Sequence, residues 1–108
     1  MIMQLTNFNH RDHGEYLNNK YPKDFFNFVL DIGSRGINHT WHIPKMAQSN
    51  PNTKFIGFEV DIPYCDEIKE MCKNMSLTNV KMTTEGFGKG EIPTPQGQTK
   101  CLDLIEIF

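Results

Sequence analysis

The sequence lacks several features that would assign it to a class directly. Its apolar runs are only a few residues long, far short of the roughly 20 that a membrane span needs, so we expect no membrane partner. Neither sign of charge dominates, since 11 basic residues face 13 acidic ones, and we do not expect a nucleic-acid partner on charge grounds. The glycine pattern GxGxxG of dinucleotide-binding proteins is also missing, because Gly33 and Gly36 supply only a fragment of it.

Cysteine is scarce. The three residues, Cys65, Cys72 and Cys101, form an odd count with no CxxC pair, which favours free thiols in a reducing compartment. The first five residues carry no basic region and no long apolar stretch of the kind that begins a secretory signal. We therefore expect a cytoplasmic protein.

Histidine occurs in two HxxH pairs, His10 with His13 and His39 with His42. Neighbours three apart on a helix can share a metal ion. No Cys, Asp or Glu stands at a matching spacing to complete a ligand set, so we predict no metal site.

Two apolar runs that each end in a carboxylate are the most informative feature of the chain. The first run leads into Asp31-Ile32-Gly33, and the second leads into Glu59. A glycine after a buried strand lets a ligand approach the backbone, and an acidic side chain at the tip of the next strand can accept hydrogen bonds from a ribose diol. This pattern predicts a βαβ unit that binds a nucleoside.

The order of the other elements supports an α/β fold. Helical spacing of apolar residues with Pro63 in the first turn predicts a helix up to Met75. A shorter helix is expected before it, either starting near Pro44 or broken there. Glycine and proline predict a long loop or a frayed hairpin over residues 86–97. The predicted strands are residues 25–31, 54–59, 79–83 and 102–108, which right-handed crossovers would arrange as a parallel sheet in the order 3-2-1-4.

The residues at the strand ends carry a family resemblance. Residues 29–36, VLDIGSRG, resemble the first motif of class I S-adenosylmethionine-dependent methyltransferases, and residues 50–61 resemble their second motif. The combination of a DIG loop with a strand ending GFEVD is similar to the FkbM-like methyltransferases. Residues 55–60 also resemble the second motif of tRNA guanine methyltransferases. The implied fold is a Rossmann-like methyltransferase domain, a partial three-layer α/β/α arrangement.

The resemblance implies a cofactor site for S-adenosylmethionine. Gly33 and the backbone around Ser34 would lie under its methionine end. Asp31 would hold the loop and, often through water, the amino group of the cofactor. Glu59 would bind the ribose hydroxyls.

Two further positions follow from the same resemblance, at the adenine end of the cofactor. Asp61 or Ile62 would flank the adenine, and Glu85 with its neighbours would cover the adenine edge. The sequence departs from the family pattern at Ile37, where a further glycine usually stands.

The resemblance covers residues 25–108, preceded by a lead-in over residues 1–24, and its residues end with the fourth strand. We therefore expect a partial cofactor-binding domain, truncated after the fourth strand, and assign no catalytic residue. The implied reaction is methyl transfer to a hydroxyl or similar nucleophile of a small-molecule acceptor such as a sugar. The alternatives are a non-catalytic fragment that binds a nucleoside or a partner chain, with self-association through an exposed sheet edge, and a tRNA guanine methyltransferase.

Overall fold

A parallel three-stranded sheet forms the centre of the molecule. The computed structural model describes residues 18–34 and 42–103. Its main sheet contains β1 (Phe28–Ile32), β2 (Lys54–Phe58) and β3 (Val80–Thr83) in the order β1-β2-β3, with both pairs parallel. The predicted order 3-2-1 is therefore confirmed for these strands, and the fold class is α/β.

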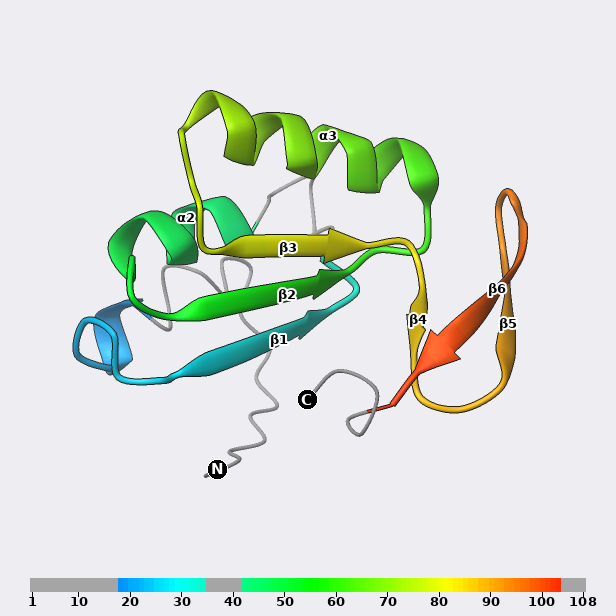
Figure 1. Ribbon diagram of the computed structural model, residues 1–108, viewed down its shortest axis with the longest axis horizontal. Coiled ribbons are helices and arrows are strands. Elements are labelled where there is room, and N and C mark those ends of the chain that lie inside the picture. Colours follow the sequence, from blue (N-terminus) through cyan, green and yellow to red (C-terminus); the bar gives the residue numbers. More distant parts are fainter. Residues whose placement is uncertain (1–17, 35–41, 104–108) are drawn as a thin grey trace.

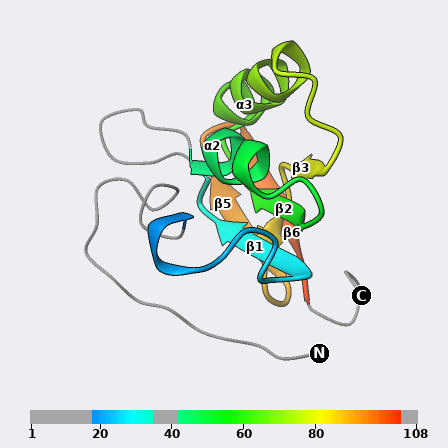
Figure 2. The same ribbon diagram turned by 90° about the vertical axis from the view of Figure 1, so that its left-hand side faces the viewer.

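Both long helices cover the same face of this sheet (Figures 1 and 2). Helix α2 (His42–Ser49) connects β1 to β2, and α3 (Ile62–Asn74) connects β2 to β3. Successive right-handed crossovers that advance in one direction place their helices on one side. The described residues thus form two layers of a Rossmann-like arrangement, and the third predicted layer does not occur among them.

The core lies between the helices and the sheet. Because side chains alternate along a strand, Phe55 and Gly57 of β2 face the helices. A Cβ atom on Gly57 would lie 2.4 Å from both Ile43 Cδ1 and Met82 Sδ, so glycine is what lets α2 approach the strand so closely. The buried cluster consists of Ile43, Met46, Ala47, Phe55, Ile68 and Cys72.

The opposite face of the sheet is less well covered. On it Phe28 is 40% exposed and Ile32 is 59% exposed, although β1 is a continuous apolar run up to Asp31. Neither helix reaches these side chains, since both helices pack on the other face. An apolar run predicts a strand, and what covers the strand is decided elsewhere in the fold.

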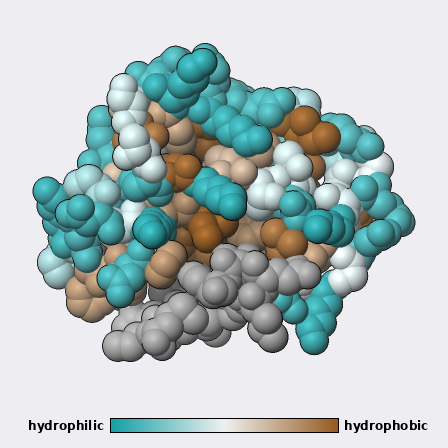
Figure 3. All heavy atoms as spheres, viewed as in Figure 1, coloured by the Kyte–Doolittle hydropathy of each residue, from teal (hydrophilic) through white to brown (hydrophobic). Residues whose placement is uncertain are grey.

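The helix boundaries follow from local chemistry. Helix α2 has Pro44 in its first turn, which resolves the two alternatives in favour of a helix that starts close to this proline. Helix α3 begins at Ile62 because Asp61 is its N-cap, and Lys73 lies in its last turn. Its outward side is hydrophilic, as the upper part of Figure 3 shows, and its buried residues are Cys65, Ile68 and Cys72.

A second, smaller sheet follows β3. It contains β4 (Gly86–Phe87), β5 (Glu91–Thr94) and β6 (Gly97–Leu102) in the order β4-β6-β5, with β5 and β6 antiparallel and β4 and β6 parallel. In Figure 1 this sheet lies on the side toward which the arrows of β1–β3 point.

For residues 86–97 the sequence predicted a long loop or a frayed hairpin, and the small sheet confirms the hairpin, because β5 and β6 pair antiparallel across a short turn. Pro93 is tolerated because β5 is an edge strand, where a missing N–H costs no hydrogen bond to a neighbour. The predicted strand over residues 102–108 is wrong at its start, because Leu102 ends β6 and pairs with β4. Residues 104–108 of that strand lie outside the described residues.

Asparagine side chains fix the end of the sheet where the strands begin. The Asn79 amide donates to the carbonyl oxygens of Ala47, Asn50 and Thr53, at 3.2, 2.9 and 2.9 Å. These carbonyls run from the last turn of α2 to the start of β2, and those of Ala47 and Asn50 also accept from the backbone N–H groups of Asn50 and Thr53. A side chain at the entry of β3 therefore ties that turn to the third strand.

The cysteines and the apolar segments can each be compared with the sequence predictions. All three cysteines are free, as expected, and all three are buried. Within the part of the chain that the structure describes, no helix is long and apolar enough to cross a membrane.

Candidate functional site

The loop after β1 is held against the end of β2. Backbone N–H groups of Gly33 and Ser34 both donate to the Phe58 carbonyl oxygen, at 2.8 and 3.1 Å. Gly33 has φ +75°, a conformation in which a Cβ is disfavoured, and no atom lies within 4 Å of where that Cβ would be. The loop therefore turns away from the strand and leaves open space beside Gly33, as a site that admits a ligand to the backbone requires.

Ser34 is fully buried and closes the turn on itself. Its Oγ donates a hydrogen bond to the Asp31 carbonyl oxygen at 3.1 Å. This bond spans the Asp-x-Gly-Ser sequence and fixes the direction in which β1 ends. The structural role of Ser34 is thus the shape of the loop.

Asp31 carries an unusual carboxylate. Its Oδ2 is sealed from solvent and has no hydrogen-bond partner within the described structure, although the residue as a whole is only half-buried. Burial raises the pKa of Asp31 from 3.8 to about 6, a hydrogen bond with Ser34 opposes the rise, and the negative charge of Glu59 adds to it. Among the described residues, no cation or hydrogen-bond donor completes this carboxylate oxygen.

Glu59 lies at the end of β2, next to this carboxylate. Its backbone N–H donates to the Thr83 carbonyl oxygen at 3.0 Å, and its Oε2 accepts from the Asp61 N–H at 3.1 Å. The residue is only 8% exposed. The backbone of Asp61 therefore positions the Glu59 carboxylate, so its orientation is set before any ligand arrives.

Asp61 has a structural role that the sequence analysis did not predict. Its Oδ1 accepts from the Tyr64 N–H at 3.5 Å, which caps the start of α3. The predicted position beside the adenine is therefore the first turn of a helix. The cap fixes the path of the chain from Glu59 into Ile62.

Glu85 follows the third strand. Its N–H donates to the Thr83 Oγ1 at 3.2 Å, and its Oε2 is buried without a hydrogen bond. Lys100 Nζ lies 3.9 Å from that oxygen, close enough for an ion pair and too far for a hydrogen bond. The ion pair connects the end of β3 to β6, and no sequence pattern predicted it.

The structure thus brings the predicted residues to one edge of the sheet. The carboxyl ends of β1, β2 and β3 carry Asp31, Glu59 and Glu85, and hydrogen bonds from Gly33 to Phe58 and from Glu59 to Thr83 join neighbouring ends. In open α/β sheets ligands bind in the crevice outside these ends. Carboxylates there accept from hydroxyl or ammonium groups, and no side chain among them is placed as a nucleophile or general base.

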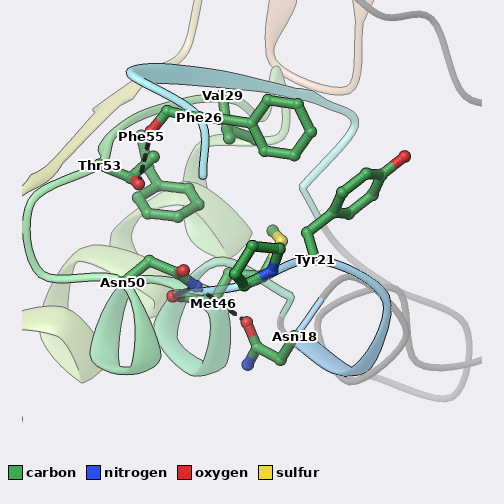
Figure 4. Close-up of a pocket in the computed structure, with 9 residues that line it drawn as sticks. Asn18, Tyr21, Phe26, Val29, Met46, Asn50, Thr53 and Phe55 are labelled. Atoms are coloured by element: carbon green, nitrogen blue, oxygen red, sulfur yellow. Dashed lines mark hydrogen bonds between the residues drawn. The ribbon is translucent and has the colours of Figure 1, made fainter. Parts of the chain in front are cut away.

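A small hollow lies elsewhere in the described structure. Figure 4 shows it beneath the lead-in to β1, where Asn18 faces Asn50 and the two amides are joined at 2.9 Å. Phe26 and Thr53, which line it, precede β1 and β2, and Val29 and Phe55 lie near the starts of these strands, so the hollow lies toward the end of the sheet opposite the carboxylates. Its enclosed space holds about one water molecule. It is a packing gap, and we assign it no ligand.

Some predicted positions fall outside what can be described. Residues 35–41, including Gly36, Ile37 and His39, are not among the described residues, nor are His10 and His13. Within residues 18–34 and 42–103, no three metal-ligating side chains gather into a site.

The fold is that of an α/β protein whose parallel strands carry carboxylates at their carboxyl ends. A comparison with known protein families matches residues 27–94, more than half of the chain, to the family described as "Putative methyltransferase". The chain belongs to this methyltransferase family. The match supports the methyltransferase class and gives no support to the FkbM-like assignment. Searches of curated proteins and of solved structures found no match.

Proposed function

We propose that this chain binds S-adenosylmethionine at the carboxyl ends of β1–β3 and serves a methyltransferase reaction. One observation carries the proposal: the family match over residues 27–94 spans both strands whose ends hold the buried carboxylates. The orphaned Oδ2 of Asp31 fits a cofactor that brings its own ammonium group.

Each predicted residue has a role in this proposal. Asp31 accepts from the ammonium group of the cofactor, and the open backbone at Gly33 admits its methionine part. Glu59 accepts from the ribose hydroxyls, with its carboxylate oriented by the Asp61 N–H. The bound cofactor supplies an electrophilic methyl group. The described residues bind and orient it, which is the main protein contribution in an in-line displacement.

We propose a guanine base of tRNA as the methyl acceptor. The matched family is of the tRNA guanine N7 type, and residues 55–60 resemble the second motif of that class. The balanced charge of the chain had argued against a nucleic acid, but charge balance bears on affinity for phosphates and leaves recognition of a base open. A hydroxyl of a small molecule, the acceptor that an FkbM-like enzyme would use, has no such support.

The first experiment is calorimetric titration with S-adenosylmethionine and S-adenosylhomocysteine. Glu59→Gln should weaken binding by about 10- to 100-fold, because it removes a charged acceptor of hydroxyl hydrogen bonds. Glu70→Gln is the matched control, since it makes the same change on an exposed position of α3 and should bind as the wild type does. Equal affinities for the two variants would refute the assignment of Glu59.

The acceptor is tested with labelled S-adenosylmethionine and a tRNA transcript, followed by nucleoside mass spectrometry. The expected product is 7-methylguanosine. Transfer to a small-molecule hydroxyl instead would replace the proposed acceptor. Cofactor binding without transfer to any acceptor would favour the non-catalytic alternative.

A further inference from the structure

The turn of the β5–β6 hairpin contacts the start of α3. Gln96, in this turn, accepts a hydrogen bond at its Oε1 from the Ile62 backbone N–H, at 3.0 Å. The two residues are 34 positions apart in the sequence. Figure 1 shows the hairpin turn beside the end of α3 that follows β2.

The donor in this contact belongs to the candidate site. Ile62 is the first residue of α3, and its N–H is one of the helix-start donors that have no partner inside the helix. The Asp61 side chain accepts from the Tyr64 N–H, so the acceptor for the Ile62 N–H comes from outside the helix, from Gln96. It lies three residues after Glu59, on the segment where a nucleoside bound by Glu59 would place its base.

A base offers the same chemistry as the glutamine that is bound there. Ring nitrogens of adenine are hydrogen-bond acceptors, as is the amide oxygen of Gln96, and one backbone N–H makes one good hydrogen bond. The two acceptors therefore compete for the Ile62 N–H. In the structure Gln96 accepts the hydrogen bond from this N–H.

The hairpin is attached to the main sheet at its base, so its turn can separate from α3. Its base is tied to the main sheet by the Glu85–Lys100 ion pair and by the Phe58–Phe87 ring contact, with centroids 5.5 Å apart. The turn itself is exposed, and Gln96 is exposed with it. Releasing Gln96 from α3 leaves these attachments at the base in place.

We propose that the β5–β6 turn is an autoinhibitory contact, in which the Gln96 side chain occupies the Ile62 N–H and a nucleoside must displace it. This inference rests on the proposed function, because it needs the base to lie beside Asp61 and Ile62. It predicts that the turn lowers affinity for the cofactor. Removing the Gln96 amide should therefore tighten binding.

The test compares the wild type with Gln96→Ala, using Gln98→Ala as control. Gln98 is exposed on the same hairpin, and its side chain makes no hydrogen bond to another described residue. Titration with S-adenosylhomocysteine should give an affinity about three- to tenfold higher for Gln96→Ala, the size expected for loss of one competing neutral hydrogen bond. Gln98→Ala should match the wild type.

Amide hydrogen exchange at Ile62 provides a readout without ligand. Gln96→Ala should speed this exchange, whereas Gln98→Ala should not. Titration of the wild type with adenosine, which lacks the amino-acid part, should shift the Ile62 amide resonance and release the Gln96 side-chain amide.

The outcomes distinguish failure of the autoinhibitory contact from failure of the proposed function. If the wild type binds and Gln96→Ala binds equally or more weakly, the autoinhibitory contact is refuted and the proposed function stands. A weaker variant would mean that Gln96 helps to hold the base. If neither protein binds, even where exchange shows that the Ile62 N–H has been freed, both proposals fail together.

Discussion

The carboxylate of Asp31 should make the protein less stable as the pH rises from about 4 to 6. Its pKa is raised from 3.8 to about 6 in the folded chain, mainly by burial. Between these values the native state holds a proton that the unfolded chain has released, so the free energy of unfolding falls with rising pH. The stability is fully present below the unfolded pKa and is lost once the pH passes the folded pKa. At 1.36 kcal/mol per unit, the loss at neutral pH is about 3 kcal/mol.

The substitution Asp31→Asn isolates this effect, because it keeps the shape of the side chain and removes the titration. The free energy of unfolding should be measured by urea denaturation, followed by circular dichroism, at several values between pH 4 and 7.5. The variant should gain about 2–3 kcal/mol relative to the wild type across this range. Any pH-independent cost of the new amide shifts the free energy of unfolding by the same amount at every pH and leaves its dependence on pH unchanged.

A second variant checks the electrostatic cause. Glu59→Gln removes the neighbouring negative charge that helps to raise the pKa of Asp31, so the window of lost stability should move to lower pH. The difference in free energy of unfolding between Asp31→Asn and the wild type should grow as the pH rises. A difference that stays constant over the whole range, or one that grows as the pH falls, would refute the conclusion that the Asp31 carboxylate is a buried anion.

Two further predictions concern the packing that holds the site in place. Gly57→Ala should lower the free energy of unfolding by about 1–3 kcal/mol, because its Cβ would meet Ile43 Cδ1 and Met82 Sδ at 2.4 Å; an unchanged urea midpoint would show that the helix and strand can move apart freely. Asn79→Ala should cost about 1–3 kcal/mol by removing the side-chain hydrogen bonds to three carbonyl oxygens, two of which keep a backbone donor, whereas Asn74→Ala on the exposed end of α3 should cost far less. Equal thermal melting of these two variants would contradict the role of Asn79.

Local signals in the sequence predicted the parallel unit well. The apolar runs ending in Asp31 and Glu59 became β1 and β2, and Pro63 with Lys73 marked a helix that the structure confirms. These features depend on neighbouring residues, so their effect can be read along the chain. The same signals left residues 86–97 open between a loop and a hairpin, because an edge strand can contain proline and a hairpin can contain glycine at its turns.

The roles of single side chains needed the folded chain. Asp61 was expected beside a cofactor and caps α3, and no pattern pointed to Gln96 as the partner of Ile62. The buried Oδ2 of Asp31 is equally a product of packing, since desolvation depends on which atoms of other elements surround it.

The sequence by itself determined strands β1–β3, the helix after the second strand and the carboxylates that end β1 and β2, because periodicity, capping and turn chemistry act over a few neighbouring residues. Only the tertiary structure decided that both helices cover one face, that β4–β6 form a separate sheet beside the strand ends, and that Gln96 reaches α3. These are contacts between residues far apart in the chain. They depend on how the elements pack, which no local pattern encodes.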